Sequence, residues 1–131
     1  MEITALDDER ESKIKKEILV DCTTGHQRLS AWYYYLQDRL SFPFKGSSIQ
    51  KRRNSPLGKN DIVEVLDLSS EDECKFGIMV DVEWDSEVLS VPLAQLEGIN
   101  VDEEAAEAIK DWHYWAGRGY SFFEKPKVSK K

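Results

Sequence analysis

The spacing of apolar residues changes twice along this chain, and this change constrains its fold more than any other feature. Between residues 24 and 41, apolar side chains recur every three or four positions, as on one face of a helix. Between residues 76 and 93 they recur every second position, as in a strand with one buried face. Helical spacing returns between residues 102 and 117. Because helices and strands fall in separate blocks, the sequence predicts an α+β domain.

The first helical block opens with a capping box. Thr24 is followed three residues later by Gln27, a pair whose side chains can cap the helix N-terminus reciprocally. The helix is predicted to end near Ser41, before Pro43. Its apolar face consists of Leu29, Trp32, Tyr33, Leu36 and Leu40. A shorter amphipathic helix is predicted over residues 9–22, although residues 17–22 could also be extended.

Three segments rich in Val, Ile, Leu and aromatic residues follow, at 61–68, 76–84 and 87–93. Asp85 and Ser86 supply a tight turn between the last two. The segments predict a small antiparallel meander, which could close into a barrel-like sheet. The stretch before them, 45–60, mixes Gly, Ser, Pro and cations and is predicted to be a solvated loop.

The last helical block begins with acids at its positive N-terminal end and closes at Gly117. Its buried stripe is Ala105, Ile109, Trp112 and Ala116. With N-terminal helices, a central meander and a C-terminal helix packed on it, the 131 residues fit a single domain. Residues 1–8 and 124–131 are predicted to be frayed tails.

The charge is concentrated in the centre of the chain. Residues 61–111 hold 16 acidic and two basic residues, a net charge of −14, whereas the whole chain carries −7. Such a segment repels nucleic acid and anionic membranes, and it attracts small cations or basic proteins. No apolar run approaches the roughly 20 residues of a membrane helix, and the acidic N-terminus is unlike a secretion signal. We therefore expect a cytoplasmic protein, a monomer, whose two cysteines are reduced.

Asp38 stands out because it falls in the last turn of the clearest helix. Free carbonyls make that end negative, so an acid there costs about 0.3–1 kcal/mol unless something compensates it. A cation could do so, since Ca²⁺ accepts about six to eight oxygen ligands, including backbone carbonyls. The carbonyls that could join Asp38 belong to Leu40, Ser41 and Phe42. The alternative is an exposed acid that pairs with a nearby Arg or Lys.

A second group of acids lies at the end of the segment 61–68 and in the loop SSEDE (69–73) after it. Its members are Asp67, Glu71, Asp72 and Glu73, and only Lys75 offsets them. A divalent cation would relieve their repulsion, so they predict a weaker metal site; the alternative is an ordinary charged hairpin tip. Further candidate ligands are Asp21, Asp81 and Glu83. No EF-hand is predicted, because Asp72 and Ser86 stand where such loops require Gly.

Enzymatic chemistry has little support, and we predict neither catalytic residues nor an organic cofactor. His26 and His113 are the only histidines, and neither lies in a metal-binding or catalytic motif. The cations at 51–53 could touch a phosphate but are too few for a nucleic-acid surface on an acidic protein. The aromatic runs 32–35 and 112–115 could line a ligand pocket, although aromatics at helical spacing more often form core.

Four separated blocks resemble a known family. They are WYYYLQDRLSFPF (32–44), SPL (55–57), VPLAQLEGI (91–99) and AIKDWHYW (108–115), in this order. Together they resemble the CcbP family of cyanobacterial calcium-binding proteins, and the likeness runs from about Val20 to Phe122. This chain departs from the family pattern in a more acidic hairpin at residues 85–87.

The resemblance implies a cytoplasmic protein that sequesters Ca²⁺ without EF-hands and so regulates calcium signalling, including heterocyst differentiation. In the family pattern, the acid just before the FPF loop is associated with the ion, and that position is Asp38 here. A competing hypothesis remains: the acidic segment could dock a basic protein partner, with calcium only screening its charge.

Overall fold

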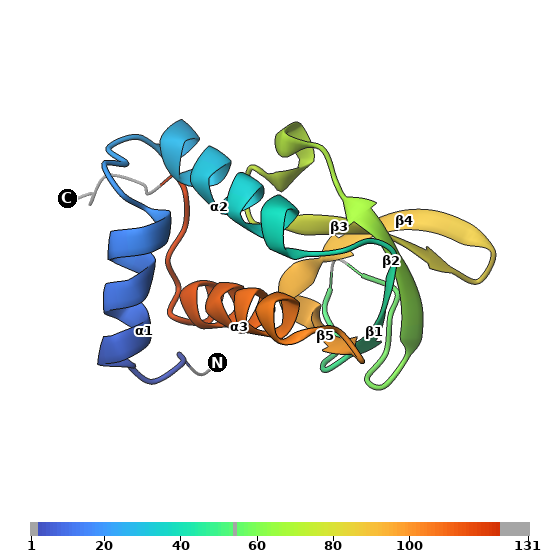
Figure 1. Cartoon of the computed structure of the whole chain (residues 1–131). Coiled ribbons are helices and arrows are strands. Elements are labelled where there is room, and N and C mark those ends of the chain that lie inside the picture. Colours follow the sequence, from blue (N-terminus) through green and yellow to red (C-terminus); the bar gives the residue numbers. More distant parts are fainter. Residues whose placement is uncertain (1–2, 54, 124–131) are drawn as a thin grey trace, which may run out of the picture.

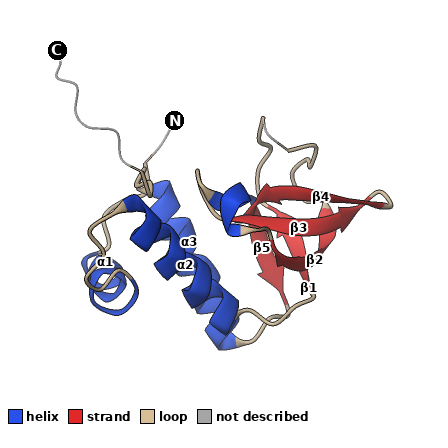
Figure 2. Cartoon of the chain, turned by 90° about the horizontal axis from the view of Figure 1, so that it is seen from above, coloured by secondary structure: helices blue, strands red, loops and turns tan. Residues whose placement is uncertain are grey.

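A computed structural model of the chain describes residues 3–53 and 55–123. Its helices lie on one side and its strands on the other (Figures 1 and 2). Helix α1 (Asp8–Lys13) continues into a π-helical segment, Ile14–Ile18, and is followed by α2 (Gly25–Arg39). Helix α3 (Glu103–Gly117) comes last. This arrangement confirms the predicted α+β class, although the first helical segment stops before the predicted end at residue 22.

The sheet is antiparallel and has five strands in the order β4-β3-β2-β1-β5. Their bounds are β1 Phe44–Ser48, β2 Ile62–Leu68, β3 Met79–Trp84, β4 Glu87–Pro92 and β5 Leu96–Ile99. Strands β2, β3 and β4 form the predicted meander, and Asp85 and Ser86 turn between the last two with positive φ angles of 54° and 66°. Because β4 and β5 are edges, the sheet is open, and the barrel-like alternative is wrong.

Strand β1 lies where the sequence predicts a solvated loop, and that prediction is wrong for residues 45–48. The strand sits between β2 and β5, and its buried positions are Phe44, Gly46 and Ser48. A Cβ at Gly46 would lie 3.3 Å from Val65 Cγ2, so glycine allows the close approach of the neighbouring strand. The inward face of β1 uses small residues after Phe44, and therefore lacks the apolar alternation that marks a strand.

Helix α2 begins as predicted. The Gln27 amide donates to Thr24 Oγ1 at 3.1 Å, and the Thr24 amide donates to Gln27 Oε1 at 3.1 Å. The buried residues of its apolar face are Leu29, Trp32 and Leu36. Leu40 follows as an extended, buried C-cap, whereas Tyr33 is only half-buried.

Replacing Thr24 with Ala should lower the free energy of unfolding by about 1 kcal/mol, because one N-terminal amide of α2 loses its cap. Urea denaturation of the variant measures this loss. Thr24→Ser keeps the hydroxyl and should differ little from the original protein. Equal losses for both variants would contradict a capping role.

Aromatic rings join α2 to α3. Trp32 is fully buried and meets Trp112 and Trp115 with centroid separations of 5.1 and 5.6 Å. Phe122, which follows α3, stacks on the same two tryptophans at 5.7 and 5.5 Å. The two aromatic runs therefore supply a large part of the core.

The N-terminal segment is tied to the end of α3, unlike the frayed tail predicted for residues 1–8. The Thr4 amide donates to the Gly117 carbonyl at 2.9 Å, and Arg118 Nη1 donates to the Thr4 carbonyl at 2.9 Å. Residues 1–2 and the predicted tail 124–131 lie outside the described residues. None of the described helices combines the length and apolar character that a membrane span requires.

Candidate metal centre

Asp38 lies at the exposed C-terminal end of α2. Its side chain is 83% exposed, and its Oδ2 is 3.8 Å from Arg39 Nη1. The Arg39 guanidinium also lies 4.1 Å from the centroid of the Tyr35 ring. The carboxylate is thus accessible, and Arg39 lies close enough to form a weak ion pair with it. This arrangement is compatible with a cation site at Asp38 and also with an exposed acid paired to an arginine.

The backbone after Asp38 offers oxygen atoms that hydrogen bonds leave free. The last helical bond of α2 runs from the Leu40 amide to the Leu36 carbonyl, at 2.8 Å. Across the described residues, the carbonyls of residues 37–42 accept no hydrogen bond. Residue 43 is proline, joined to Phe42 by a cis peptide bond, and has no amide hydrogen to donate. A carboxylate with unbonded carbonyls is a set of hard oxygen donors, which fits Ca²⁺.

The second group of acids is divided between two places. Glu71 opens the 3₁₀ turn Glu71–Cys74 and accepts a hydrogen bond from Ser30 Oγ of α2, at 3.2 Å. Asp72 is 89% exposed, and its Oδ1 is 3.9 Å from Lys75 Nζ. Glu73 lines a different cavity, on the side facing α3. Glu71 and Asp72 therefore line one pocket with Ser30 and Lys75, whereas Glu73 lies in the wall of another.

Strand pairing instead brings together two acids from different groups. Asp67 on β2 and Asp81 on β3 are direct cross-strand partners. Asp81 Oδ1 accepts from Ser69 Oγ at 2.7 Å, and this hydroxyl lies 2.9 Å from Ser90 Oγ of β4. Like charges directly opposite each other destabilise a sheet, so a bound cation would relieve this pair.

The same face of the sheet continues the acidic pattern. As predicted, Asp81 and Glu83 point away from the buried Val80 and Val82. Glu83 opposes Glu64 across β2 and β3, while Lys45 Nζ lies 3.5 Å from Glu64 Oε1. Lys45 is thus directed to Glu64, and within residues 3–53 and 55–123 neither Asp67 nor Asp81 forms an ion pair.

Tyr33 lies in the negative potential near the Asp67–Asp81 pair. Its hydroxyl donates to the Ser69 carbonyl at 2.8 Å. Burial raises the pKa of Tyr33, and so do the neighbouring Cys74 and the carboxylates of Asp67 and Glu71. The carboxylates of Asp67, Asp81 and Glu71 therefore all act around Ser69.

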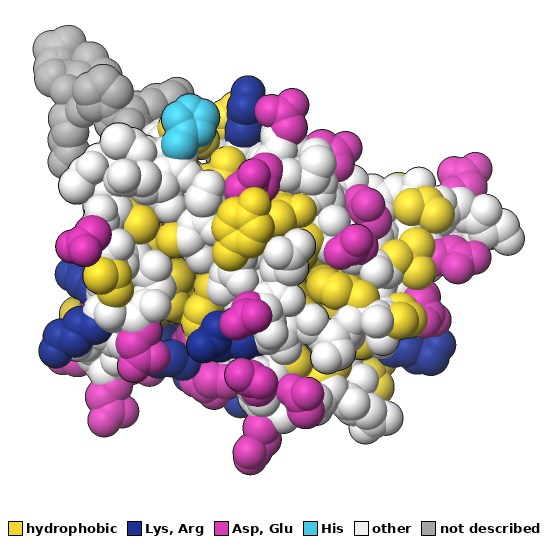
Figure 3. Space-filling view, turned by 45° about the horizontal axis from the view of Figure 1, so that its top comes forward, with side chains coloured by type: hydrophobic (Ala, Val, Ile, Leu, Met, Phe, Trp, Pro, Cys, Tyr) yellow, Lys and Arg dark blue, Asp and Glu magenta, His cyan; other side chains and the backbone are white. Residues whose placement is uncertain are grey.

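Other candidates stay apart from both places. Asp21 occupies an exposed turn before α2, with a positive φ of 59°. Acidic side chains are spread over the surface rather than gathered in one patch, as Figure 3 shows for one face. Over residues 3–53 and 55–123, no three His, Cys, Asp or Glu side chains form a group that could hold a metal ion. A site here needs backbone or hydroxyl oxygens as well as carboxylates.

Sequence reasoning missed the hydroxyl groups. Ser69 and Ser90 touch the acid pair or each other, and Ser30 binds Glu71, but serines on strands and helices give no pattern of their own. The two-residue period of β3 and β4 could have placed Ser90 on the face of Asp81. Ser69 follows β2 beyond its register shift between Val65 and Asp67, and carries no such signal.

Comparisons with known proteins agree with this chemistry. The family model of calcium-binding CcbP proteins, described as "Calcium binding", matches residues 12–116. The crystal structure of Anabaena CcbP superimposes with a TM-score of 0.78 and 39% sequence identity, covering 92% of this chain and 99% of that chain.

A second solved structure, a calcium-binding protein in the calcium-binding form, has a TM-score of 0.76 and 40% identity over 88% of this chain and 94% of that chain. The search of curated proteins gave no significant match. The match to the family model covers most of the sequence, and both structures share the fold over nearly all of it. The chain therefore belongs to the calcium-binding CcbP family.

Proposed function

We propose that this protein binds and sequesters Ca²⁺ through sites that are not EF-hands. The observation that supports this proposal is the exposed carboxylate of Asp38 beside the unbonded carbonyls of residues 37–42. It stands in a chain that is 40% identical to a protein solved in its calcium-binding form. Sequestration would lower free cytosolic Ca²⁺ and so act on calcium signalling. Heterocyst differentiation is the process that the family resemblance implies.

The tighter site is built on Asp38. Its carboxylate would supply the charge, and the carbonyls of Leu40, Ser41 and Phe42 would supply neutral oxygens. Arg39 Nη1, 3.8 Å from the carboxylate, would compete with the ion, so binding should favour the contact of Arg39 with the Tyr35 ring. The remaining ligands of Ca²⁺ would be water, since it takes about six to eight oxygens.

A weaker site is built on the pair of Asp67 and Asp81. Glu71 lies near enough to influence the same tyrosine as Asp67, and the Ser69 hydroxyl already binds Asp81. The outlying acids would add long-range attraction rather than ligands; they are Asp21, Asp72, Glu73 and Glu83. An exposed site with few shared ligands binds weakly, which suits a buffer.

The test is a calorimetric titration of the metal-free protein with Ca²⁺, in millimolar Mg²⁺ and physiological salt. We expect saturable binding, and the tighter phase should vanish in Asp38→Asn. At a free Ca²⁺ concentration of 100 Kd, the ion should stabilise the protein by about 2.7 kcal/mol, a thermal shift that the variant should lose. Asp85→Asn, in the exposed turn between β3 and β4, removes the same charge and should keep the full shift.

Two outcomes would contradict the proposal. An unchanged calcium-dependent shift in Asp38→Asn would remove Asp38 from the site. Equal effects of Mg²⁺ and Ca²⁺ at the same ionic strength would favour the competing hypothesis, because screening of an acidic interaction surface does not distinguish ion size.

A further inference from the structure

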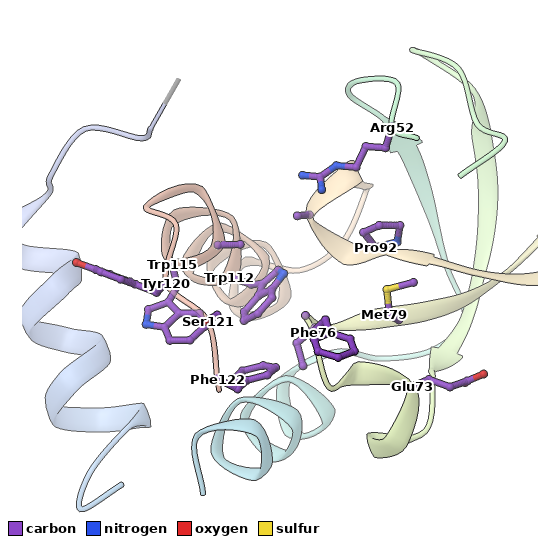
Figure 4. A pocket seen from close by; sticks show the side chains of 14 residues that line it. Arg52, Glu73, Phe76, Met79, Pro92, Trp112, Trp115, Tyr120, Ser121 and Phe122 are labelled. Atoms are coloured by element: carbon purple, nitrogen blue, oxygen red, sulfur yellow. The ribbon is translucent and has the colours of Figure 1, made fainter. Parts of the chain in front are cut away.

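A cavity of about 400 Å³ lies between α3 and the edge of the sheet, away from Asp38 and from the Asp67–Asp81 pair. Its walls come mainly from α3, the segment after it, and residues 76–79; their aromatic side chains include Trp112, Trp115, Phe122 and Phe76 (Figure 4). This volume falls within the range of small-molecule sites. Phe76 is 94% exposed, although it is a large apolar side chain. The cavity thus has both polar and aromatic side chains in its walls, and one of the aromatic rings is uncovered.

Two buried N–H groups of residues in the cavity wall lack hydrogen-bond partners among the described residues. Trp112 is 3% exposed, and across the described residues its indole Nε1 has no hydrogen-bond partner. The Nε of Arg52 is buried and equally unbonded within residues 3–53 and 55–123. Both residues line the cavity, and the indole nitrogen of Trp112 is on the side of the ring that faces Arg52 (Figure 4). Buried donors are rarely left unpaired, so this pair calls for an acceptor.

The electrostatics define the charge of that acceptor. Arg52 forms no ion pair with any acid in the described part of the chain. Glu73, the one acid in the wall, points its carboxylate away from Arg52 (Figure 4). An uncompensated guanidinium and a second N–H donor in the wall of the same cavity suit an anionic oxygen group. The same guanidinium disfavours Ca²⁺, so the cavity serves a different ligand from the metal sites.

We propose that this cavity binds a small aromatic carboxylate. The carboxylate oxygens would accept from Arg52 and from Trp112 Nε1, and the ring would lie against the aromatic wall and beneath Phe76. A neutral aromatic compound would contact the aromatic side chains but would form no charge-assisted hydrogen bond with Arg52. A cationic compound would be repelled by the Arg52 guanidinium. This ligand-binding role is independent of calcium binding and goes beyond it.

The test is a titration of the ¹⁵N-labelled protein with 2-naphthoate in calcium-free buffer, observed through the indole N–H resonances in NMR. Trp112→Phe assigns the Trp112 signal. We expect this signal to shift saturably, as a donor does when it gains an acceptor. Arg52→Gln should weaken binding about tenfold or more, by loss of a charge-assisted hydrogen bond. Phe76→Ala should weaken it about three- to tenfold, by loss of aromatic contact.

Matched controls distinguish binding in this cavity from non-specific electrostatic or hydrophobic binding elsewhere on the surface. Arg53→Gln removes an exposed neighbouring cation outside this cavity, and Val88→Ala removes an exposed apolar side chain from β4; neither should change the affinity. The neutral 2-naphthylmethanol should bind about tenfold more weakly than 2-naphthoate. The indole spectra of the free variants show that they are folded. The proposal is overturned if no saturable shift occurs, or if Arg52→Gln and Arg53→Gln bind 2-naphthoate equally.

Discussion

Replacing Asp111 with Ala should lower the free energy of unfolding by about 3–5 kcal/mol, the cost of breaking a buried ion pair by removing one partner. Asp111 lies on α3 with no exposed surface, and three donors surround its carboxylate. Lys13 Nζ donates at 2.8 Å and the Tyr35 hydroxyl at 2.7 Å, and Arg10 Nη1 completes the set. The variant would leave the Tyr35 hydroxyl without this acceptor, and Arg10 and Lys13 would share only the half-exposed carboxylate of Glu107.

Equilibrium denaturation in urea measures this loss, and Glu107→Gln is the matched control. Glu107 also pairs with Arg10 Nη1, at 2.8 Å, but its side chain is 47% exposed. A solvated ion pair contributes about 0–1 kcal/mol, so the control should lose little stability. If the two variants lose similar amounts of unfolding free energy, the burial of Asp111 does not make its ion pairs more stabilising than the exposed pair of Glu107. Because Asp111 joins α1 and α2 to α3, its removal should also loosen α1 first.

The helices were predictable because their signals are local. The capping box of α2 and the spacing of its apolar face depend only on neighbours in sequence, and both are confirmed. Helix α3 follows the same rule, since Asp102 caps its first turn by accepting from the Ala105 amide at 2.8 Å. The central meander shows a two-residue period along β3, which is equally local.

Strands β1 and β5 were missed because their identity depends on distant partners. Strand β5 has only the four residues Leu96–Ile99, too few for a periodic signal. Strand β1 becomes a strand through its pairing with both β2 and β5, and Gly46 permits that close approach. Leu57, within the predicted loop, is fully buried although its flanking residues read as solvated. Long-range pairing decides such segments, and sequence spacing does not record it.

The candidate metal site also has one part that local sequence predicts and another that depends on distant pairing. Asp38 could be singled out from its position at a helix end, which is a local property. The opposition of Asp67 and Asp81 could not, because the register shifts between Val65 and Asp67 and only the bulged pairing sets these residues opposite each other. The separation of Glu73 from Glu71 and Asp72 follows from the 3₁₀ turn, whose successive side chains point in different directions.

The aromatic runs illustrate a third limit. Sequence spacing favours a core role for Trp112 and Trp115, and their burial agrees with it. The same residues nevertheless line the cavity, because Arg52 and Phe76 approach from segments far away in sequence. A residue can be both core and cavity wall, and only the distant segments reveal the second role. The sequence predicts that Arg52 lies in a solvated loop, because its neighbours along the chain are polar.

Replacing Trp32 with Ala should lower the free energy of unfolding by about 3–5 kcal/mol, since the largest side chain between α2 and α3 would leave a cavity. The ring of Trp32 is fully buried and contacts Trp112, Trp115 and Tyr35 edge-on or at a tilt. Trp32→Phe should lose much less stability. It keeps a ring, and it deletes an indole N–H that has no partner within the described residues.

Urea denaturation compares these two variants with Phe76→Ala, which removes an aromatic side chain that is 94% exposed. Phe76→Ala should change the free energy of unfolding by at most about 0.5 kcal/mol, as surface substitutions do. If Trp32→Phe costs as much as Trp32→Ala, the shape of the indole rather than buried volume holds the two helices together. If Trp32→Ala costs no more than Phe76→Ala, the interface between α2 and α3 is not part of the cooperative core, and the stability of the protein resides in the sheet.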